Sequence, residues 1–315
     1  MNKKNINAVL SKVHKEFYES ITDPLVREAV KNNSIITGGA LVSLLTGQEV
    51  NDYDYYFTDF DTCLMVTDYY VTLINKKHGG IATVKTDECN RIKIFIKSHG
   101  VAGDDETEPN LPSYTDPQPV LIEEDELFQF ADEDEEDEDN IIFQTNITPD
   151  SDLKNIDPNP KFQPVFLSSN AITLRGKIQL VIRFYGNAQE IHDNYDFVHC
   201  MNYWTSKDKK VVLNPLALEA IINKELIYTG SRYPLCSIIR TRKFIARGYT
   251  INAGQYLKMC MQLNDLNLKN IGVLEDQLVG VDSAYFNMLI EKLRKQDENI
   301  DITTDYVISV IDKIF

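Results

Sequence analysis

The sequence has no run of about 18 apolar residues, so it predicts no membrane-spanning helix. Cysteines are few: five among 315 residues, scattered and without a Cys-x-x-Cys pair. Such thiols argue against a disulfide framework and a zinc site, and they favour a reducing compartment. The first 19 residues contain lysines but no apolar stretch with a cleavage site, which indicates an amphipathic helix and not a signal peptide. These absences together predict a cytoplasmic type of protein.

Basic residues are absent between residues 101 and 140. The segment from Asp104 to Asp139 holds 17 acidic residues, so it accounts for the net charge of −16 and leaves +1 on the rest of the chain. A run of like charges repels itself and stays solvated. We therefore predict an acidic surface insertion at about 101–140. Its apolar residues Leu127, Phe128 and Phe130 leave open a second interpretation, a segment that binds a basic partner or shields a basic groove.

The apolar pattern predicts a mixed α/β domain followed by a helical half. Helices are expected within residues 1–31 and at 40–46 and 68–77, and strands at 34–37, 50–58, 91–97 and 177–184. Residues 195–204 alternate as well, and we expect this strand to pair with 177–184. Four helical segments follow from residue 214 onward, the last at 285–295. The predicted domains are 1–205, which contains the acidic insertion, and 206–315, which is helical.

Two adjacent glycines, Gly38 and Gly39, separate the short strand at 34–37 from the next helix. A glycine pair lets the backbone approach a ligand, and the amides of a first helical turn attract an anion such as a phosphate. Shortly afterwards Asp52 and Asp54 occupy positions i and i+2 of a predicted strand, so both side chains point to one face. Neighbouring carboxylates repel each other unless a cation separates them, and they suit hard divalent ions. Each pattern alone also occurs in ordinary turns and solvated strands; the combination is more specific.

Glycine-glycine, a helical turn and Asp-x-Asp together resemble the signature of the DNA-polymerase-β-like nucleotidyltransferase superfamily. The pattern is most similar to the head domain of CCA-adding enzymes and bacterial poly(A) polymerases. The resemblance implies an α/β (α+β) fold, with a small mixed sheet in the head and a helical C-terminal half. It also implies that Gly38 and Gly39 hold the phosphates of a nucleoside triphosphate. Asp52 and Asp54 would then act in catalysis by binding Mg²⁺ or Mn²⁺.

A third carboxylate on a neighbouring strand completes the site in that superfamily. Asp196 is our candidate for a catalytic metal ligand, because it lies in the alternating segment and resembles the Phe-Asp pattern of divergent, often viral, members. Asp193 and Glu88 are the alternatives. His192 and His199 flank Asp196, but the chain offers too few compactly spaced ligands for zinc. We therefore expect both histidines to pack or to form hydrogen bonds.

A predicted helix in the C-terminal half carries Arg240, Lys243 and Arg247 at the spacing i, i+3, i+7, which forms one cationic face. Such a face can simply be solvated. Our sharper hypothesis is that it binds the triphosphate or an acceptor phosphate, together with Lys177 or Arg175 from the preceding strand.

These features predict a metal-dependent nucleotidyltransferase, which moves a nucleoside monophosphate from a nucleoside triphosphate to a hydroxyl acceptor and releases pyrophosphate. Tyr228, Tyr233 and Tyr249 are candidates to stack on the base. The acceptor is an RNA, a protein or a small molecule. A near-neutral body without a basic stripe favours the last two over an RNA tail. The chain also has Val42-Ser43 where CCA-type enzymes usually have Arg-Asp, which argues against tRNA ends.

A second hypothesis is a nucleotidyltransferase fold kept as a non-catalytic binding or structural module. Its acidic insertion fits a docking role, whereas the intact Asp-x-Asp argues for the enzyme. The abundance of Tyr, Asn, Ile and Lys is typical of phage proteins, so we expect a host-cytoplasmic or virion protein.

Overall fold

The computed structural model describes residues 2–87, 90–96, 160–168 and 170–268, and also 270, 273, 274 and 277. All of them belong to one compact unit, made of residues 1–97 and 151–315. The predicted acidic insertion and the last predicted helix, 285–295, lie outside the described residues. The basic partner expected for that insertion therefore stays a prediction, as does the domain boundary at 205.

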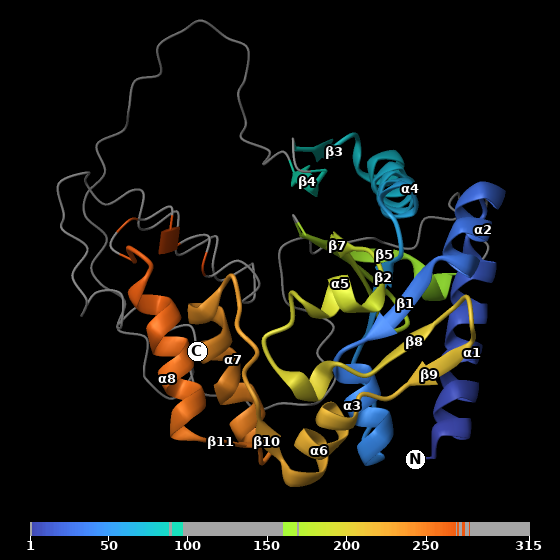
Figure 1. Ribbon diagram of the computed structural model, residues 1–315. Helices are drawn as coiled ribbons and strands as arrows, with labels where there is room; N and C mark the ends of the chain where they lie inside the picture. Colours follow the sequence, from blue (N-terminus) through green and yellow to red (C-terminus); the bar gives the residue numbers. More distant parts are fainter. Residues whose placement is uncertain are drawn as a thin grey trace, which may run out of the picture. The chain divides into compact units, whose positions relative to one another are not determined.

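A seven-stranded mixed sheet forms the centre of this unit, in the order β5-β6-β7-β2-β1-β8-β9 (Figure 1). Its strands are β1 (Ser34–Thr37), β2 (Tyr53–Phe57), β5 (Pro164–Leu167), β6 (Ala171–Leu174), β7 (Ile178–Tyr185), β8 (Tyr203–Thr205) and β9 (Lys210–Val212). Within this sheet β2 and β7 run parallel, and the other neighbouring strands are antiparallel. Two further pairs are β3 (Ala82–Thr86) with β4 (Ile92–Ile96), and β10 (Glu225–Leu226) with β11 (Thr250–Ile251).

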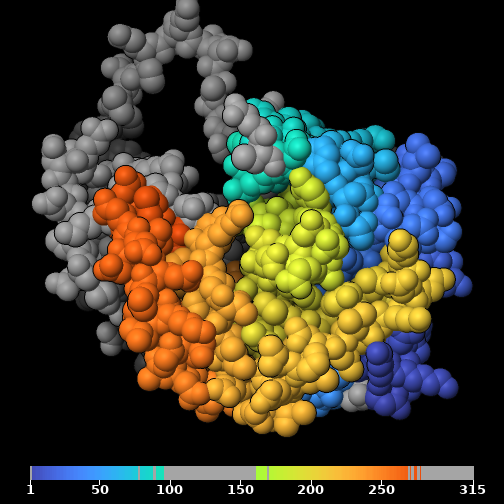
Figure 2. All heavy atoms as spheres, in the orientation of Figure 1, coloured from blue at the N-terminus to red at the C-terminus, as the bar shows by residue number. Residues whose placement is uncertain are grey.

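The described part of the chain contains eight α-helices. They are α1 (Lys3–Ser20), α2 (Pro24–Asn32), α3 (Gly39–Thr46), α4 (Phe60–His78), α5 (Ala188–His192), α6 (Pro215–Asn223), α7 (Pro234–Ala246) and α8 (Ala253–Asn264). The space-filling view shows α5, in yellow-green, on the same face of the molecule as α7 and α8, in orange (Figure 2). The predicted mixed α/β class is confirmed. None of the described helices is long and apolar enough to cross a membrane.

Local sequence signals explain where the helices begin and end. Asn2 and Asp59 cap α1 and α4, because each side chain accepts a hydrogen bond from a backbone amide of the first turn. Asp23 caps α2, whose first residue is a proline. The helix α3 ends at Gly47, which has φ of +77° in the left-handed region that glycine tolerates.

The main core lies on one face of the sheet, where α1, α2 and α4 pack. It contains the inward residues of β2 and β7, namely Tyr55, Phe57, Ile178, Leu180 and Ile182, all fully buried. The opposite face has a smaller cluster formed by Ile35, Tyr56, Ala188 and Ile191, which α5 contributes to. A third cluster, around Phe197, Tyr228 and Met259, holds α7 and α8 to the loops that follow α5. The strands alternate between the first two clusters, as period-two patterning requires.

One predicted strand is wrong. Residues 195–204 do not pair with β7: they contain a bend, a short 3₁₀ helix (Val198–Cys200) and only the start of β8, which pairs with β1. The reason is that β7 already has β2 on one side and β6 on the other. The alternation around Phe197 instead reflects the third cluster, in which Phe197 packs on Tyr228 and forms an isolated bridge with it.

His14 on α1 is a buried titratable group in the main core. Its Nε2 lies 3.1 Å from the carbonyl oxygen of Lys31, and its ring packs against Tyr55 and Trp204. Burial lowers the pKa of His14 from 6.5 to about 4, although the bond to Lys31 opposes this. The folded protein therefore keeps this imidazole neutral, while the unfolded chain binds a proton below pH 6.5.

We expect His14→Gln to flatten the acid side of the stability profile. The contribution of neutral His14 is fully present above pH 6.5 and is lost as the pH falls towards 4, by about 3 kcal/mol for a shift of this size. Urea unfolding at a series of pH values between 4.5 and 7.5 measures this loss. The variant should take up about one proton fewer on unfolding near pH 5.

Val13→Ala on the same helix is the matched control, because it removes core contacts without removing a titrating group. It should lower the free energy of unfolding by a similar amount at every pH. If His14→Gln had the same pH dependence of stability as the wild type, the loss of stability at acid pH would not come from His14.

Candidate functional site

The turn between β1 and α3 lies directly against the carboxylate of Asp54. Gly38 has φ of +84°, and a Cβ atom built on it would lie 2.8 Å from Asp54 Oδ2 and 3.4 Å from Tyr195 Oη. The antiparallel register of β1 and β2 places Thr37 opposite Asp54, which fixes this close approach. Only glycine satisfies both the backbone conformation and the contact.

The amides around this turn differ in what they bind. Gly38 N–H donates to the carbonyl of Cys200 at 3.2 Å, so it is engaged within the chain. The helix α3, which starts at Gly39, has no side-chain cap at its N-terminus. A Cβ atom at Gly39 would meet nothing within 4 Å. The amides available for an anion are therefore those of the first turn of α3, where the helix dipole is positive.

Asp52 and Asp54 share one face of β2 but differ in exposure. Asp52 is exposed just before the strand, whereas Asp54 is partly buried within it. Burial, and after it the negative charge of Asp52, raise the pKa of Asp54 to about 8, although Lys243 and Arg240 oppose both effects. Two carboxylates that repel each other beside an open turn fit one hard divalent cation. Among the described residues, however, no three His, Cys, Asp or Glu side chains form a metal-binding group.

Asp196 reaches the site but does not occupy the position expected for it. It lies in the bend after α5, with its side chain 13% exposed, and its Oδ2 accepts a 2.7 Å bond from Arg240 Nη1. β2 lies between β1 and β7, whose registers place Thr37 and Gln179, neither of them a carboxylate, next to Asp54. A hydroxyl and an amide therefore stand at the neighbouring-strand positions where the resemblance implied a carboxylate. The alternative Asp193 is exposed and bonds Gln189, and Glu88 lies outside the described residues.

The cationic face predicted on α7 lies towards this site. Arg240 and Lys243 both act electrostatically on Asp54, and Arg240 also acts on Tyr56 two residues along the same face. Arg247, which follows the last residue of α7, acts on His199 and Cys200. Two of the three predicted cations, Arg240 and Lys243, thus act on Asp54, whereas Arg247 acts on the residues around the 3₁₀ helix.

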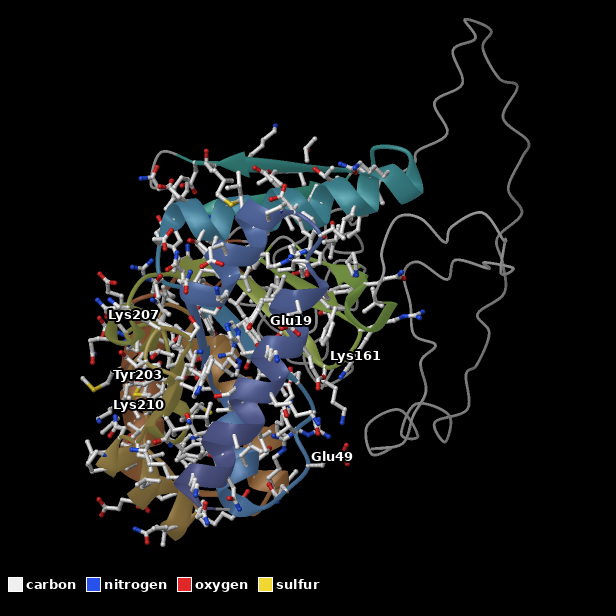
Figure 3. The ribbon with its side chains drawn as sticks, turned by 90° about the vertical axis from the view of Figure 1, so that its right-hand side faces the viewer. Glu19, Glu49, Lys161, Tyr203, Lys207 and Lys210 are labelled. Atoms are coloured by element: carbon white, nitrogen blue, oxygen red, sulfur yellow. The ribbon has the colours of Figure 1, made fainter. Side chains whose placement is uncertain are left out.

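Lys177 is not brought to this group. It lies in the turn between β6 and β7, where its Nζ bonds Glu49 Oε1 at 2.5 Å and the carbonyl of Val50 at 3.1 Å. Burial raises the pKa of Tyr53, and the charge of Lys177 opposes this rise; Tyr53 points to the other face of β2 from Asp54. Glu49 is labelled in Figure 3. The phosphate-binding role predicted for Lys177 has no geometric support, and Arg175 is likewise an exposed residue of that turn.

Arg183 and Gln179 are site-face residues that the sequence reasoning did not single out. They alternate with the buried Leu180 and Ile182 on β7, so they share the face of Asp54. The guanidinium of Arg183 lies 4.3 Å from the ring centroid of Tyr233, a cation–π contact with the start of α7. The alternation of apolar and polar residues along 177–184 is the sequence pattern that could have identified them.

The candidate tyrosines and histidines differ in whether they lie in packed clusters or near the site. Tyr228 and Tyr249 are buried in the third cluster, so only the partly buried Tyr233 stays near the site face as a stacking candidate. His192 bonds Thr37 Oγ1 at 2.8 Å, and His199 packs edge-on against Phe244 at 4.5 Å. The packing and hydrogen-bonding roles predicted for both histidines are confirmed.

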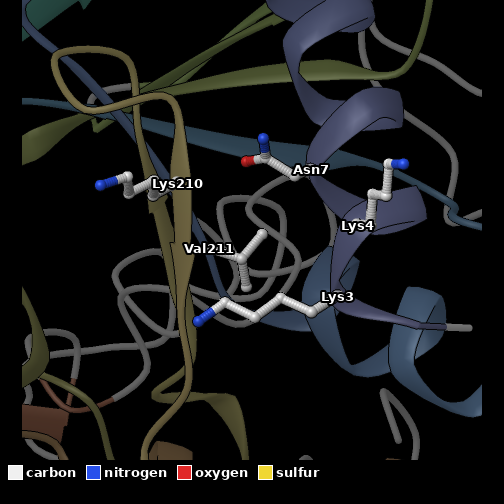
Figure 4. Close-up of a pocket in the computed structure, with 5 residues that line it drawn as sticks. All are labelled: Lys3, Lys4, Asn7, Lys210 and Val211. Atoms are coloured by element: carbon white, nitrogen blue, oxygen red, sulfur yellow. The ribbon is translucent and has the colours of Figure 1, made fainter.

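A shallow groove of about 370 Å³ lies elsewhere, between α1 and β9, and is shown in Figure 4. It is lined by Lys3, Lys4, Asn7, Lys210 and Val211. Asn7 accepts a hydrogen bond from the indole of Trp204, and the ammonium groups of Lys4 and Lys210 point away from the centre of the groove. None of the predicted site residues lines it.

Comparison with known proteins identifies a family for this chain. The sequence profile described as Gabija anti-defense 2 family protein matches residues 2–224. A curated relative, Gabija anti-defense 2 of Bacillus phage SPbetaL7, is 19% identical over 299 residues, which cover 94% of this chain and 54% of the relative. The chain therefore spans about half the length of that relative.

Similar solved structures are distant. A tRNA-processing enzyme in apo form I is 12% identical with a TM-score of 0.36, covering 100% of this chain and 59% of that one. The Thermotoga maritima CCA-adding enzyme complexed with tRNA_CCA is 10% identical with a TM-score of 0.36, covering 90% and 56%. Such values carry no argument about function. Because the family profile spans most of the sequence, this chain belongs to the Gabija anti-defense 2 family.

Proposed function

We propose that this chain is a metal-dependent nucleotidyltransferase with a polymerase-β-like head. It transfers a nucleoside monophosphate from a nucleoside triphosphate to a hydroxyl of an RNA, a protein or a small molecule, and releases pyrophosphate. The observation that carries the proposal is the approach of the Gly38 backbone to the Asp54 carboxylate. That contact joins the phosphate-binding motif and the metal-binding motif, which the sequence places apart, into one site.

Each group in the site has a part in such a transfer. The uncapped first turn of α3 binds the triphosphate tail through its amides. Asp52 and Asp54 hold the cation, which supplies neutralisation of phosphate charge and activation of the acceptor hydroxyl. Arg240 and Lys243, whose charges already act on Asp54, would stabilise the negative charge on the oxygens of the transferred phosphoryl group and of the leaving pyrophosphate. Positioning and electrostatics dominate this chemistry, so the site needs no covalent nucleophile.

The family name relates the protein to a defence system. Members are described as acting against a defence called Gabija. We propose that the transfer reaction serves that action, for example by modifying a component of the defence or a molecule that the defence needs.

A non-catalytic binding module is the second candidate, and one observation favours it. The carboxylate expected to complete the site, Asp196, is ion-paired with Arg240, and Gln179 stands on the neighbouring strand. A site with only Asp52 and Asp54 for metal would still bind a nucleotide, and the protein would then act by binding.

We expect nucleoside triphosphates with Mg²⁺ or Mn²⁺ to raise the melting temperature of the protein. Saturation at 100 times Kd corresponds to about 2.7 kcal/mol of added stability. The double variant Asp52→Asn/Asp54→Asn should lose this effect while it folds at least as well, because it removes two carboxylates that repel each other. Titration of the four nucleotides by thermal shift, with and without metal, is the measurement.

Glu49→Gln is the matched control. It removes a carboxylate from the same loop, but that carboxylate bonds Lys177 and does not belong to the site. It should keep the nucleotide response. Transfer of label from an α-labelled triphosphate to RNA, protein or small molecules in a host extract then separates the two candidates. Binding without transfer would support the module, and no response to any nucleotide would contradict both.

Gly38→Ala should abolish the nucleotide response. The added Cβ atom would lie 2.8 Å from Asp54 Oδ2, so either the turn or the carboxylate must move. The backbone of Gly38, with φ of +84° and ψ of −146°, is a conformation that essentially only glycine adopts, so alanine also adds strain of about 1–3 kcal/mol. Thermal shift with and without metal and nucleotide measures both effects.

Gly47→Ala at the other end of α3 separates them, because Gly47 has φ of +77° and nothing within 4 Å of the added atom. Gly47 is in the left-handed helical region, so the variant should lose about 1 kcal/mol of stability but keep nucleotide binding. Equal nucleotide responses in the two variants would show that the contact with Asp54 is unimportant.

A further inference from the structure

The ion pair between Asp196 and Arg240 connects the segment after α5 to α7 beside the candidate site. Arg240 Nη1 donates to Asp196 Oδ2 at 2.7 Å, a short charge-assisted bond. The Asp196 side chain is 13% exposed and that of Arg240 is 43% exposed. The Asp196 side chain is therefore the more enclosed of the two, and the arginine side chain as a whole is the more exposed one.

Asp196 is held in place by its own backbone surroundings. Its carbonyl accepts a hydrogen bond from Thr229 N at 3.0 Å, and Thr229 Oγ1 donates to the carbonyl of Tyr195 at 2.7 Å. The next residue, Phe197, forms the isolated bridge with Tyr228 and packs in the third cluster. This fixed carboxylate can orient the longer and more flexible arginine side chain.

The oriented guanidinium acts on the candidate site. The charge of Arg240 acts on Asp54 and on Tyr56, both on the site face of β2. A guanidinium has five N–H donors in a rigid fork, so a bond to Asp196 is compatible with further bonds to phosphate oxygens. Asp196, by contrast, already uses Oδ2 for Arg240 and belongs to no metal-binding group of three in the described residues.

We infer that Asp196 is a positioning residue, which holds Arg240 towards the triphosphate of the bound nucleotide and does not ligate the metal. The inference rests on the proposed function. It assigns Asp52 and Asp54 as the two carboxylates for the cation, and it gives the third predicted carboxylate a different role.

The test compares Mn²⁺ binding with nucleotide binding in the full chain. Free Mn²⁺ is followed by electron paramagnetic resonance, and triphosphate binding by calorimetry with Mg²⁺ present. Asp196→Asn, which can still accept a hydrogen bond, should keep Mn²⁺ affinity within about twofold and weaken triphosphate binding about tenfold, or about 1.4 kcal/mol. Asp54→Asn should lose Mn²⁺ binding instead.

A double-mutant cycle tests whether Asp196 acts through Arg240. Asp196→Asn combined with Arg240→Gln should bind the triphosphate no more weakly than Arg240→Gln alone. Glu16→Gln, which breaks the exposed pair with Lys161 at 2.8 Å, is the control for loss of an ion pair in general and should change neither readout.

The outcomes distinguish the role inferred for Asp196 from the proposed function. Loss of Mn²⁺ binding in Asp196→Asn as large as in Asp54→Asn would make Asp196 a metal ligand and overturn the inference alone. Additive effects of Asp196→Asn and Arg240→Gln on triphosphate binding would also overturn it. A wild-type chain that binds neither Mn²⁺ nor any triphosphate would overturn the proposed function, and the inference with it.

Discussion

The contact between the Gly38 backbone and the Asp54 carboxylate is the constraint on which the site depends. It follows from the pairing of β1 with β2, which sets Thr37 opposite Asp54 and leaves the chain to turn into α3 immediately afterwards. A side chain at Gly38 would fill the space. The same pairing buries Tyr55 and Phe57 in the core beneath, so the main core and the site share one structural support.

Charge is the second organising feature. Partial burial of Asp54 beside Asp52 is unfavourable, and the structure offsets it with cations from α7, a helix far away in the sequence. The third cluster, through Phe197 and Tyr228, holds α7 where Arg240 meets Asp196. The helical half is thus part of the site's electrostatics, and the charged face that it presents suits an anionic ligand such as a triphosphate.

Family membership and site geometry contribute different information. The family assignment covers residues 2–224, which include Asp52, Asp54 and Asp196 but not the cations of α7. The curated relative is about twice as long as this chain. The name describes an outcome against a defence, whereas the geometry suggests a chemistry. The proposed nucleotidyl transfer would link the two, since a single modification can inactivate a target without lasting contact.

Much of this architecture was predictable from the sequence, because it depends on local signals. The strand at 34–37, the glycine turn, the helix that Gly47 ends and the strand bearing Asp54 all follow from short-range patterning, as does the spacing of the α7 cations. Which strand lies beside β2, and which partner Asp196 finds, depended on the tertiary structure. β7 had both edges occupied, so residues 195–204 could not join it. The alternation of a segment says that one of its faces is buried; it does not say against what. Sheet pairing is a competition between distant segments, and only the folded chain resolves it.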